Sequence, residues 1–243
     1  MKSNETIISV QNLIKKFGQF VANDDLNFEV YKGEIFGFLG ANGAGKTTAI
    51  KILCGLSAPT SGDINVAGFD VYKQTNDIKR NIGYMSQKFS LYEDLTIAEN
   101  FRFYGGIYGL SKKQIQSKTD LLLKKLKLED SKNKIISSIP LGWKQKLAFS
   151  IAIMHDPKIV FLDEPTGGVD PITRRQFWEL IYETTHSGMT VFVTTHYMDE
   201  AEYCDRVSIM IDGKISALDS PEMLKQSYGV SSMDEVFLKL ARN

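Results

Sequence analysis

The sequence contains few cysteines and no long apolar segment. Its two cysteines, Cys54 and Cys204, stand far apart in apolar or helical surroundings, which predicts reduced, partly buried thiols rather than a disulfide or a metal site. No run approaches the roughly 18 apolar residues that a membrane-spanning helix requires. The first residues lack a basic region followed by an apolar stretch, so no secretion signal is expected.

The sequence also lacks an excess of charge of either sign. Lys plus Arg and Asp plus Glu both total 29, which gives a net charge of zero. Nucleic-acid binders need basic residues to displace counterions from phosphates, so no nucleic-acid partner is expected. With 243 residues, 43% of them hydrophobic, the chain fits one large domain or one domain with an inserted subdomain.

The order of strand and helix patterns predicts an α/β fold with a mostly parallel sheet. Apolar runs typical of strands occur at 7–10, 26–30, 35–39, 62–67, 159–162, 191–194 and 207–211. Helical spacing occupies about 89–156 and returns at about 172–185. We therefore predict one domain over 1–243. Its core (1–88 and 157–220) begins with an antiparallel β region, residues 89–156 form an inserted helical subdomain, and a C-terminal tail covers 221–243.

A glycine-rich loop lies between the strand predicted at 35–39 and a helical pattern. It reads Gly40-Ala41-Asn42-Gly43-Ala44-Gly45-Lys46-Thr47, followed by Thr48. This is the order of a Walker A loop, whose backbone N–H groups and helix N-terminus bind phosphates. Lys46 would then neutralise the terminal phosphates of ATP and the Thr47 hydroxyl would bind Mg²⁺. The alternative, a plain glycine turn with a surface lysine, does not explain the strand–loop–helix order.

Two carboxylates end a second buried strand. The run Ile159-Val160-Phe161-Leu162 leads directly into Asp163 and Glu164. Ligands bind at the carboxyl ends of strands in such sheets, so Asp163 can hold Mg²⁺ and Glu164 can act as general base towards the attacking water. Two acids after a strand often form only a solvated loop, and their pairing with the Walker A loop favours the catalytic interpretation. Together the two motifs predict a P-loop NTPase core that uses ATP and Mg²⁺.

With these motifs, the chain resembles the nucleotide-binding subunit of an ABC transporter over nearly its whole length. Tyr84-Met85-Ser86-Gln87 resembles the Q-loop, which implies that Gln87 senses the γ-phosphate through Mg²⁺ or water. Gly168-Val169-Asp170-Pro171 resembles the D-loop, which would place Asp170 at a dimer interface, where it can also cap the next helix. Thr194-Thr195-His196 resembles the H-loop, in which His196 contacts the γ-phosphate. Singly, these residues have ordinary structural explanations; their order favours the functional ones.

Phe17 resembles the aromatic residue that stacks on adenine, with packing in the core as the alternative.

The family's signature sequence Leu-Ser-Gly-Gly-Gln is altered in this chain. The matching stretch begins Ile139-Pro140-Leu141-Gly142 and continues into an apolar helix. Pro140 replaces the phosphate-contacting serine and supplies neither a hydroxyl nor a backbone N–H. Leu141 replaces the first glycine, while Gly142 and the helix N-terminus remain to bind an anion. The chain would therefore lend a weakened half-site to a second nucleotide-binding subunit, in either a homodimer or a heterodimer.

The resemblance implies an ATPase at the cytoplasmic face of a membrane that powers transport through a separate integral membrane permease. Residues 140–143 and the end of the chain (220–222 and 233–238) resemble the ABC-2-like export subfamily. Phe89, Ser90, Leu91 and Tyr92, with aromatics such as Phe101 and Tyr104, would supply an apolar surface for the permease or fill the helical subdomain's own core. The alternative is a soluble single-domain relative in a non-transport assembly, such as iron–sulfur cluster assembly.

Overall fold

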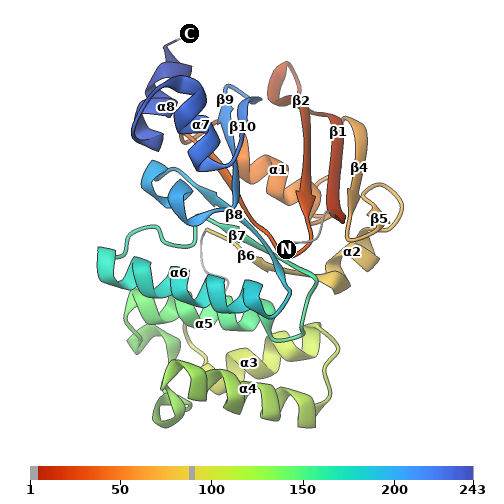
Figure 1. The fold of residues 1–243 in the computed structure, drawn as a ribbon. Coiled ribbons are helices and arrows are strands. Elements are labelled where there is room, and N and C mark those ends of the chain that lie inside the picture. The colour runs from red at the N-terminus through yellow and green to blue at the C-terminus, as the bar shows by residue number, and fades with distance from the viewer. Residues whose placement is uncertain (1–4, 88–90, 243) are drawn as a thin grey trace.

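The computed structural model describes residues 5–87 and 91–242, and its strands form two sheets (Figure 1). The antiparallel sheet has the order β2(Phe20–Tyr31), β1(Thr6–Phe17), β4(Ser61–Val66), β5(Phe69–Asp70). The larger sheet has the order β10(Lys214–Asp219), β9(Arg206–Ile211), β3(Ile35–Gly40), β8(Thr190–Thr195), β7(Ile159–Asp163), β6(Ile82–Met85). Its pairs are parallel except β10 with β9. The predicted α/β class with an N-terminal antiparallel region is confirmed.

Strand β3 is the centre of the larger sheet and joins two cores. All six of its residues are buried, as a parallel strand covered on both faces requires. Phe36 and Phe38 face the antiparallel sheet and α1(Lys46–Leu53), where the Phe38 ring lies 5.3 Å from that of Phe192. Ile35 and Leu39 face the opposite core, which the helical part of the chain completes. The end of β3 is thus held from both sides.

The helices between β6 and β7 form the lower part of the molecule in Figure 1. They are α3(Ile97–Ile107), α4(Lys112–Leu126) and α5(Leu141–Ile153), with short 3-10 turns at Glu129–Ser131 and Ile136–Ser138. Capping boxes begin α3 at Thr96 and α4 at Ser111. Phe101 is fully buried and Tyr104 packs against the same core. Phe89 and Ser90, expected in the surface beside Gln87, lie outside the described residues.

The structure extends several sequence predictions. The strands expected at 7–10 and 26–30 are each 12 residues long, because cross-strand pairing continues to Phe17 and Phe20. Short α2(Thr75–Asn81) precedes β6, and α6(Pro171–His186) lies beside α5. The stretch expected as a tail folds into α7(Pro221–Tyr228) and α8(Met233–Ala241), which bury Leu224 and Val236. Cys54 and Cys204 are free and buried, as expected.

Candidate functional site

The loop between β3 and α1 has a backbone shape that requires glycine. Gly45 has φ 102°, and a Cβ on it would lie 2.2 Å from the carbonyl oxygen of Ala22 in β2. The Lys46 side chain folds back over the loop, and its Nζ donates hydrogen bonds to the carbonyl oxygens of Gly40 at 2.8 Å and Ala41 at 3.1 Å. The loop therefore curls tightly at the carboxyl end of the central strand and at the N-terminus of α1, where unpaired helix N–H groups favour anions.

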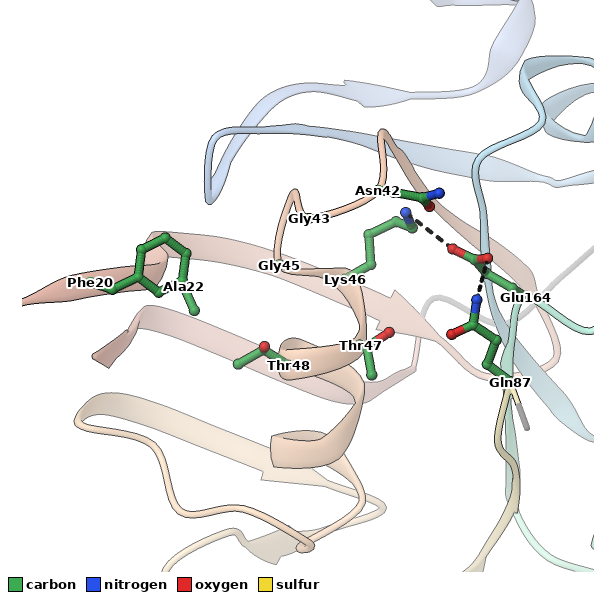
Figure 2. Close-up of a pocket in the computed structure, with 10 residues that line it drawn as sticks. All are labelled: Phe20, Ala22, Asn42, Gly43, Gly45, Lys46, Thr47, Thr48, Gln87 and Glu164. Carbon is green, nitrogen blue, oxygen red and sulfur yellow. Dashed lines mark hydrogen bonds and ion pairs between the residues drawn. The ribbon is translucent and has the colours of Figure 1, made fainter. Parts of the chain in front are cut away.

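A cavity of about 260 Å³ borders this loop (Figure 2). Its lining comprises Phe20, Ala22, Asn42, Gly43, Gly45, Lys46, Thr47, Thr48, Gln87 and Glu164. Most of the predicted phosphate-binding residues thus share one cavity. Gly40 and Ala44 are buried in the loop itself and do not line it.

Glu164 is the point at which four segments of the chain meet. Its carboxylate accepts a hydrogen bond from Gln87 Nε2 at 2.9 Å and contacts His196 Nδ1 at 3.1 Å. The ammonium group of Lys46 lies 3.4 Å from its other oxygen, and both side chains are nearly buried. Burial lowers the pKa of Lys46, and the neighbouring Glu164 carboxylate opposes that shift. Of the three residues predicted as catalytic, Gln87 and His196 therefore both lie within hydrogen-bond reach of Glu164, next to the Walker A lysine.

Asp163 lies deeper, at the last position of β7. Its Oδ1 accepts hydrogen bonds from the hydroxyls of Thr47 at 3.2 Å and Thr194 at 2.7 Å. Burial raises the pKa of Asp163, and these two hydrogen bonds oppose the shift. A carboxylate, a hydroxyl and the nearby Gln87 amide are hard oxygen donors of the kind that Mg²⁺ prefers, so the residues fit that ion. Within 5–87 and 91–242 no group of three or more His, Cys, Asp or Glu side chains could hold a metal, and Mg²⁺ bound through ATP needs none.

Sequence reasoning missed Thr194 as a member of this site. It pairs with Asp163 across the β7–β8 ladder. Its carbonyl and hydroxyl oxygens also accept from the backbone N–H of Glu164, at 3.2 and 3.0 Å. Glu164 has φ 49°, a left-handed conformation that costs a non-glycine residue on the order of 1 kcal/mol or more. Thr194 therefore holds Glu164 in a strained backbone conformation that turns its side chain towards Lys46.

Gly142 and Asp170 lie away from the Glu164 cluster. They line a second cavity of about 330 Å³, which shares no lining residue with the first. Pro140 occupies the N-cap position of α5 without a side-chain hydrogen bond, and a Cβ on Gly142 would lie 2.4 Å from Cγ2 of Thr173 in α6. Asp170 caps α6 by accepting from the backbone N–H groups of Ile172 and Thr173, both at 3.0 Å. Within a single chain, these two residues therefore do not line the cavity at Lys46.

The aromatic at the first cavity is Phe20, whereas the sequence singled out Phe17. The two pair across the β1–β2 hairpin, and Phe17 and Phe20 are 55% and 63% exposed. Lys15 Nζ lies 4.8 Å from the centroid of the Phe17 ring. Phe17 therefore does not pack in the core, and Phe20 is the one that lines the cavity (Figure 2).

A P-loop core, a helical insertion and this cluster of motif residues define an ATP-binding cassette. The family model described as "ABC transporter" matches residues 23–167. The chain belongs to the ABC transporter family, as an ATP-binding component. Among the described helices, none has the length and apolarity that crossing a membrane requires.

Curated relatives include two bacterial ATP-binding proteins. The chain is 46% identical over 241 residues to "Probable multidrug ABC transporter ATP-binding protein YbhF" of Escherichia coli (strain K12), an alignment of 97% of this chain and 42% of the relative. It is 34% identical over 246 residues to "Linearmycin resistance ATP-binding protein LnrL" of Bacillus subtilis (strain 168), covering 98% of this chain and 79% of the relative. The chain thus spans less than half of the first of these.

Solved structures share the fold. An ATP-binding subunit of an ABC transporter superposes with a TM-score of 0.87 at 28% identity, over 97% of this chain and 100% of the other. A dimeric ATP-binding cassette in a post-hydrolysis state, bound to ADP and Pi, superposes with a TM-score of 0.79 at 25% identity, over 88% and 98% of the two chains.

Proposed function

We propose that this chain hydrolyses ATP with Mg²⁺ at the cavity of Figure 2 and so powers export through a separate integral membrane permease. The observation that carries the hydrolytic part is the convergence of Lys46, Gln87 and His196 on Glu164. The export part is supported by relatives named for multidrug transport and linearmycin resistance. The chain would act as a peripheral subunit at the cytoplasmic face of the membrane.

The phosphate groups of ATP would bind at the N-terminus of α1. Lys46 would exchange its contacts with Gly40 and Glu164 for the β- and γ-phosphates, whose negative charge is a stronger partner. Thr47 and Asp163 would hold Mg²⁺, with Gln87 contributing directly or through water. The ion would neutralise charge on the transferring phosphoryl group.

Glu164 would then act as general base. It accepts a proton from the attacking water, whose oxygen forms a bond to the γ-phosphorus while the bond from that phosphorus to the bridging oxygen breaks, which yields ADP and inorganic phosphate. Gln87 and His196 already contact the Glu164 carboxylate and would orient both it and the γ-phosphate. Burial of Glu164 excludes bulk water, which strengthens these contacts.

Gly142, the α5 N-terminus and Asp170 would serve the nucleotide of a second subunit. They lie in a separate cavity, and a related cassette forms a dimer with ADP and Pi bound. Because Pro140 and Leu141 replace the serine and a glycine of the signature, the half-site that this chain lends is weakened. In a heterodimer whose partner has a complete signature, the site formed by this chain's Walker A loop and the partner's signature would have all of its motifs.

Affinity purification of the tagged chain from native membranes tests the proposal. We expect an integral membrane protein to copurify and ATP to be hydrolysed. With Glu164→Gln, we expect the same partner but turnover lower by about a thousandfold, since the base is lost while shape is kept. Lys46→Ala serves as the control for lost nucleotide binding. Copurification with soluble proteins alone would refute the transport role, and normal turnover of the glutamine variant would refute the assigned base.

A further inference from the structure

Arg174 occupies the first turn of α6 and is not used in the mechanism above. Its backbone N–H donates to the carbonyl oxygen of Asp170 at 3.0 Å, so it stands one helical turn after the cap. Its side chain is 18% exposed, and Nη1 donates to Oδ2 of Asp199 at 3.3 Å. The guanidinium carbon lies 4.1 Å from the centroid of the Tyr197 ring. The cation is therefore stacked and directed inward, unlike its neighbour Arg175, whose side chain is 81% exposed.

Beneath Arg174 lies a carboxylate that the site does not otherwise explain. Glu200 is fully buried, and its Oε1 accepts a hydrogen bond from the Thr166 hydroxyl at 2.6 Å. Nε of Arg174 lies 3.6 Å from the same oxygen. A buried charge is costly unless it is paired, and Arg174 is the cation that the structure places against it. Neither Arg174 Nε nor Glu200 Oε2 has a hydrogen-bond partner among the described residues, so the pair is held as an ion pair.

The residues around this pair flank the hydrolytic centre on both sides. Thr166 follows Glu164 by two positions, in the segment that leaves β7. Tyr197 follows His196 directly, and their rings lie 4.1 Å apart. Arg174 thus contacts, directly or through Glu200, the segments that carry the proposed base and the histidine bonded to it. Its own helix is capped by Asp170, the residue expected at a subunit interface.

We propose that Arg174 is a positioning residue for ATP hydrolysis. Its guanidinium joins the first turn of α6 to the segments after Glu164 and His196, and this joint fixes how those two side chains face each other. Movement of Asp170 at a subunit interface is thereby transmitted to the hydrolytic centre through one rigid turn of helix. This inference rests on the proposed function, because it assigns Arg174 to the reaction centred on Glu164.

The test compares variants that keep the fold. Arg174→Met alone leaves Glu200 buried without its cation, so it is combined with Glu200→Gln, which removes both charges and keeps side-chain size. Arg174→Lys keeps the charge but loses the planar stacking on Tyr197. Arg175→Met is the matched control on the exposed side of the same helix. For each variant, kcat and KM for ATP are measured on the chain purified with the partners it retains, and the melting temperature is recorded.

We call the combination of Arg174→Met with Glu200→Gln the neutral pair variant. We expect it to melt close to the wild type but to lose about tenfold or more in kcat, since small misplacements of reacting groups are costly. KM for ATP should change by less than about twofold, because the residues at the phosphates are untouched. Arg174→Lys should be intermediate, and combination of the neutral pair variant with His196→Ala should cost less than the two losses multiplied together.

If Arg174 and Glu200 have only a structural role, a different result is expected. A neutral pair variant that melts like the wild type and keeps wild-type kcat would overturn the positioning role. So would equal losses in the Arg175→Met control. These outcomes are separate from failure of the proposed function, because that failure appears as normal turnover in Glu164→Gln, whatever the Arg174 variants do.

Discussion

Phe17 and Phe20, at the end of the β1–β2 hairpin, are two candidates for stacking on adenine, and the sequence and the structure favour different ones. Sequence resemblance points to Phe17 for adenine stacking, whereas Phe20 lines the cavity beside the Walker A loop. Both rings are exposed, as a stacking platform must be before its ligand binds. Both sit where the hairpin closes, so a small bend of either strand changes which ring faces the nucleotide.

We predict that Phe20→Ala weakens ATP binding by roughly tenfold, and that Phe17→Ala weakens it less. Stacking between an aromatic ring and a base contributes about 1–3 kcal/mol, and Phe20 is already at the cavity. Affinities can be measured by calorimetry on variants that also carry Glu164→Gln. Tripolyphosphate, which has no base, is the control ligand and should bind all variants alike. The reverse ranking of the two alanine variants would return the role to Phe17.

The sequence predicted the site residues that belong to motifs continuous in the chain. The Walker A loop is continuous in sequence, so its glycines, Lys46 and Thr47 could be found without a fold. Thr194, Phe20 and Arg174 join the site through strand register, hairpin closure and helix packing. These relations depend on residues far apart in the chain, and no short motif encodes them. Asp163 lies opposite Thr194 only because β7 and β8 pair in that register.

Among the elements, α5 and α6 approach each other closely at their N-termini. Gly142 in α5 faces the Thr173 methyl group of α6, with room for no side chain between them. The Thr173 hydroxyl donates to the capping carboxylate of Asp170 at 2.6 Å. The N-terminal turns of α5 and α6 therefore meet at Gly142, where a larger residue would displace Thr173.

We predict that Gly142→Ala destabilises the chain by about 1–2 kcal/mol. A contact as short as 2.4 Å favours the upper part of the usual overpacking cost of about 1–3 kcal/mol, from which the roughly 1 kcal/mol by which alanine favours a helix over glycine is subtracted. Thr173→Ser removes the obstructing methyl and keeps the hydroxyl, so the double variant should recover the loss. Thermal or urea unfolding gives the comparison, with Thr173→Ser alone as control. Equal stability of Gly142→Ala and wild type would contradict so close an approach of the two helices.

The prediction of elements succeeded where the apolar pattern was local and strong. The strands around β3, β7 and β8 and the helical insertion were anticipated, because buried parallel strands read as continuous apolar runs. The helices α7 and α8 were expected only as a tail. Short amphipathic segments resemble surface loops in sequence, so these two helices were not predicted. In the structure, Leu224, Met233 and Val236 form their buried face against the core.

At the scale of the whole molecule, the altered signature bears on assembly. If the isolated chain forms homodimers, both of its composite sites contain Pro140 and Leu141. We predict that Pro140→Ser combined with Leu141→Gly raises ATP turnover of the isolated chain by roughly a hundredfold, the lower end of the range of about 10²–10³ for one donor to developing charge. A steady-state phosphate-release assay at several protein concentrations measures this.

Leu121→Ser is the matched control, because Leu121 is 66% exposed and lies on α4, outside both cavities. The melting temperature of the double variant shows whether the new glycine weakens α5. Unchanged turnover in a folded double variant would indicate that the signature substitutions do not limit hydrolysis. Turnover by the wild-type chain alone as fast as in its complex would exclude the need for a heterodimeric partner.

In the ion pair between Lys46 and Glu164, the Glu164 carboxylate occupies the ammonium group that the phosphates of ATP are proposed to bind. Each ATP that enters has to exchange one buried carboxylate for its own phosphates at the same ammonium group. Breaking the contact between Lys46 and Glu164 uses part of the intrinsic binding energy of ATP, which lowers the apparent affinity for ATP. The freed carboxylate becomes available to water only after the phosphates have arrived. We therefore expect that binding of the phosphates separates Lys46 from Glu164, the proposed base, and so couples substrate arrival to release of that carboxylate.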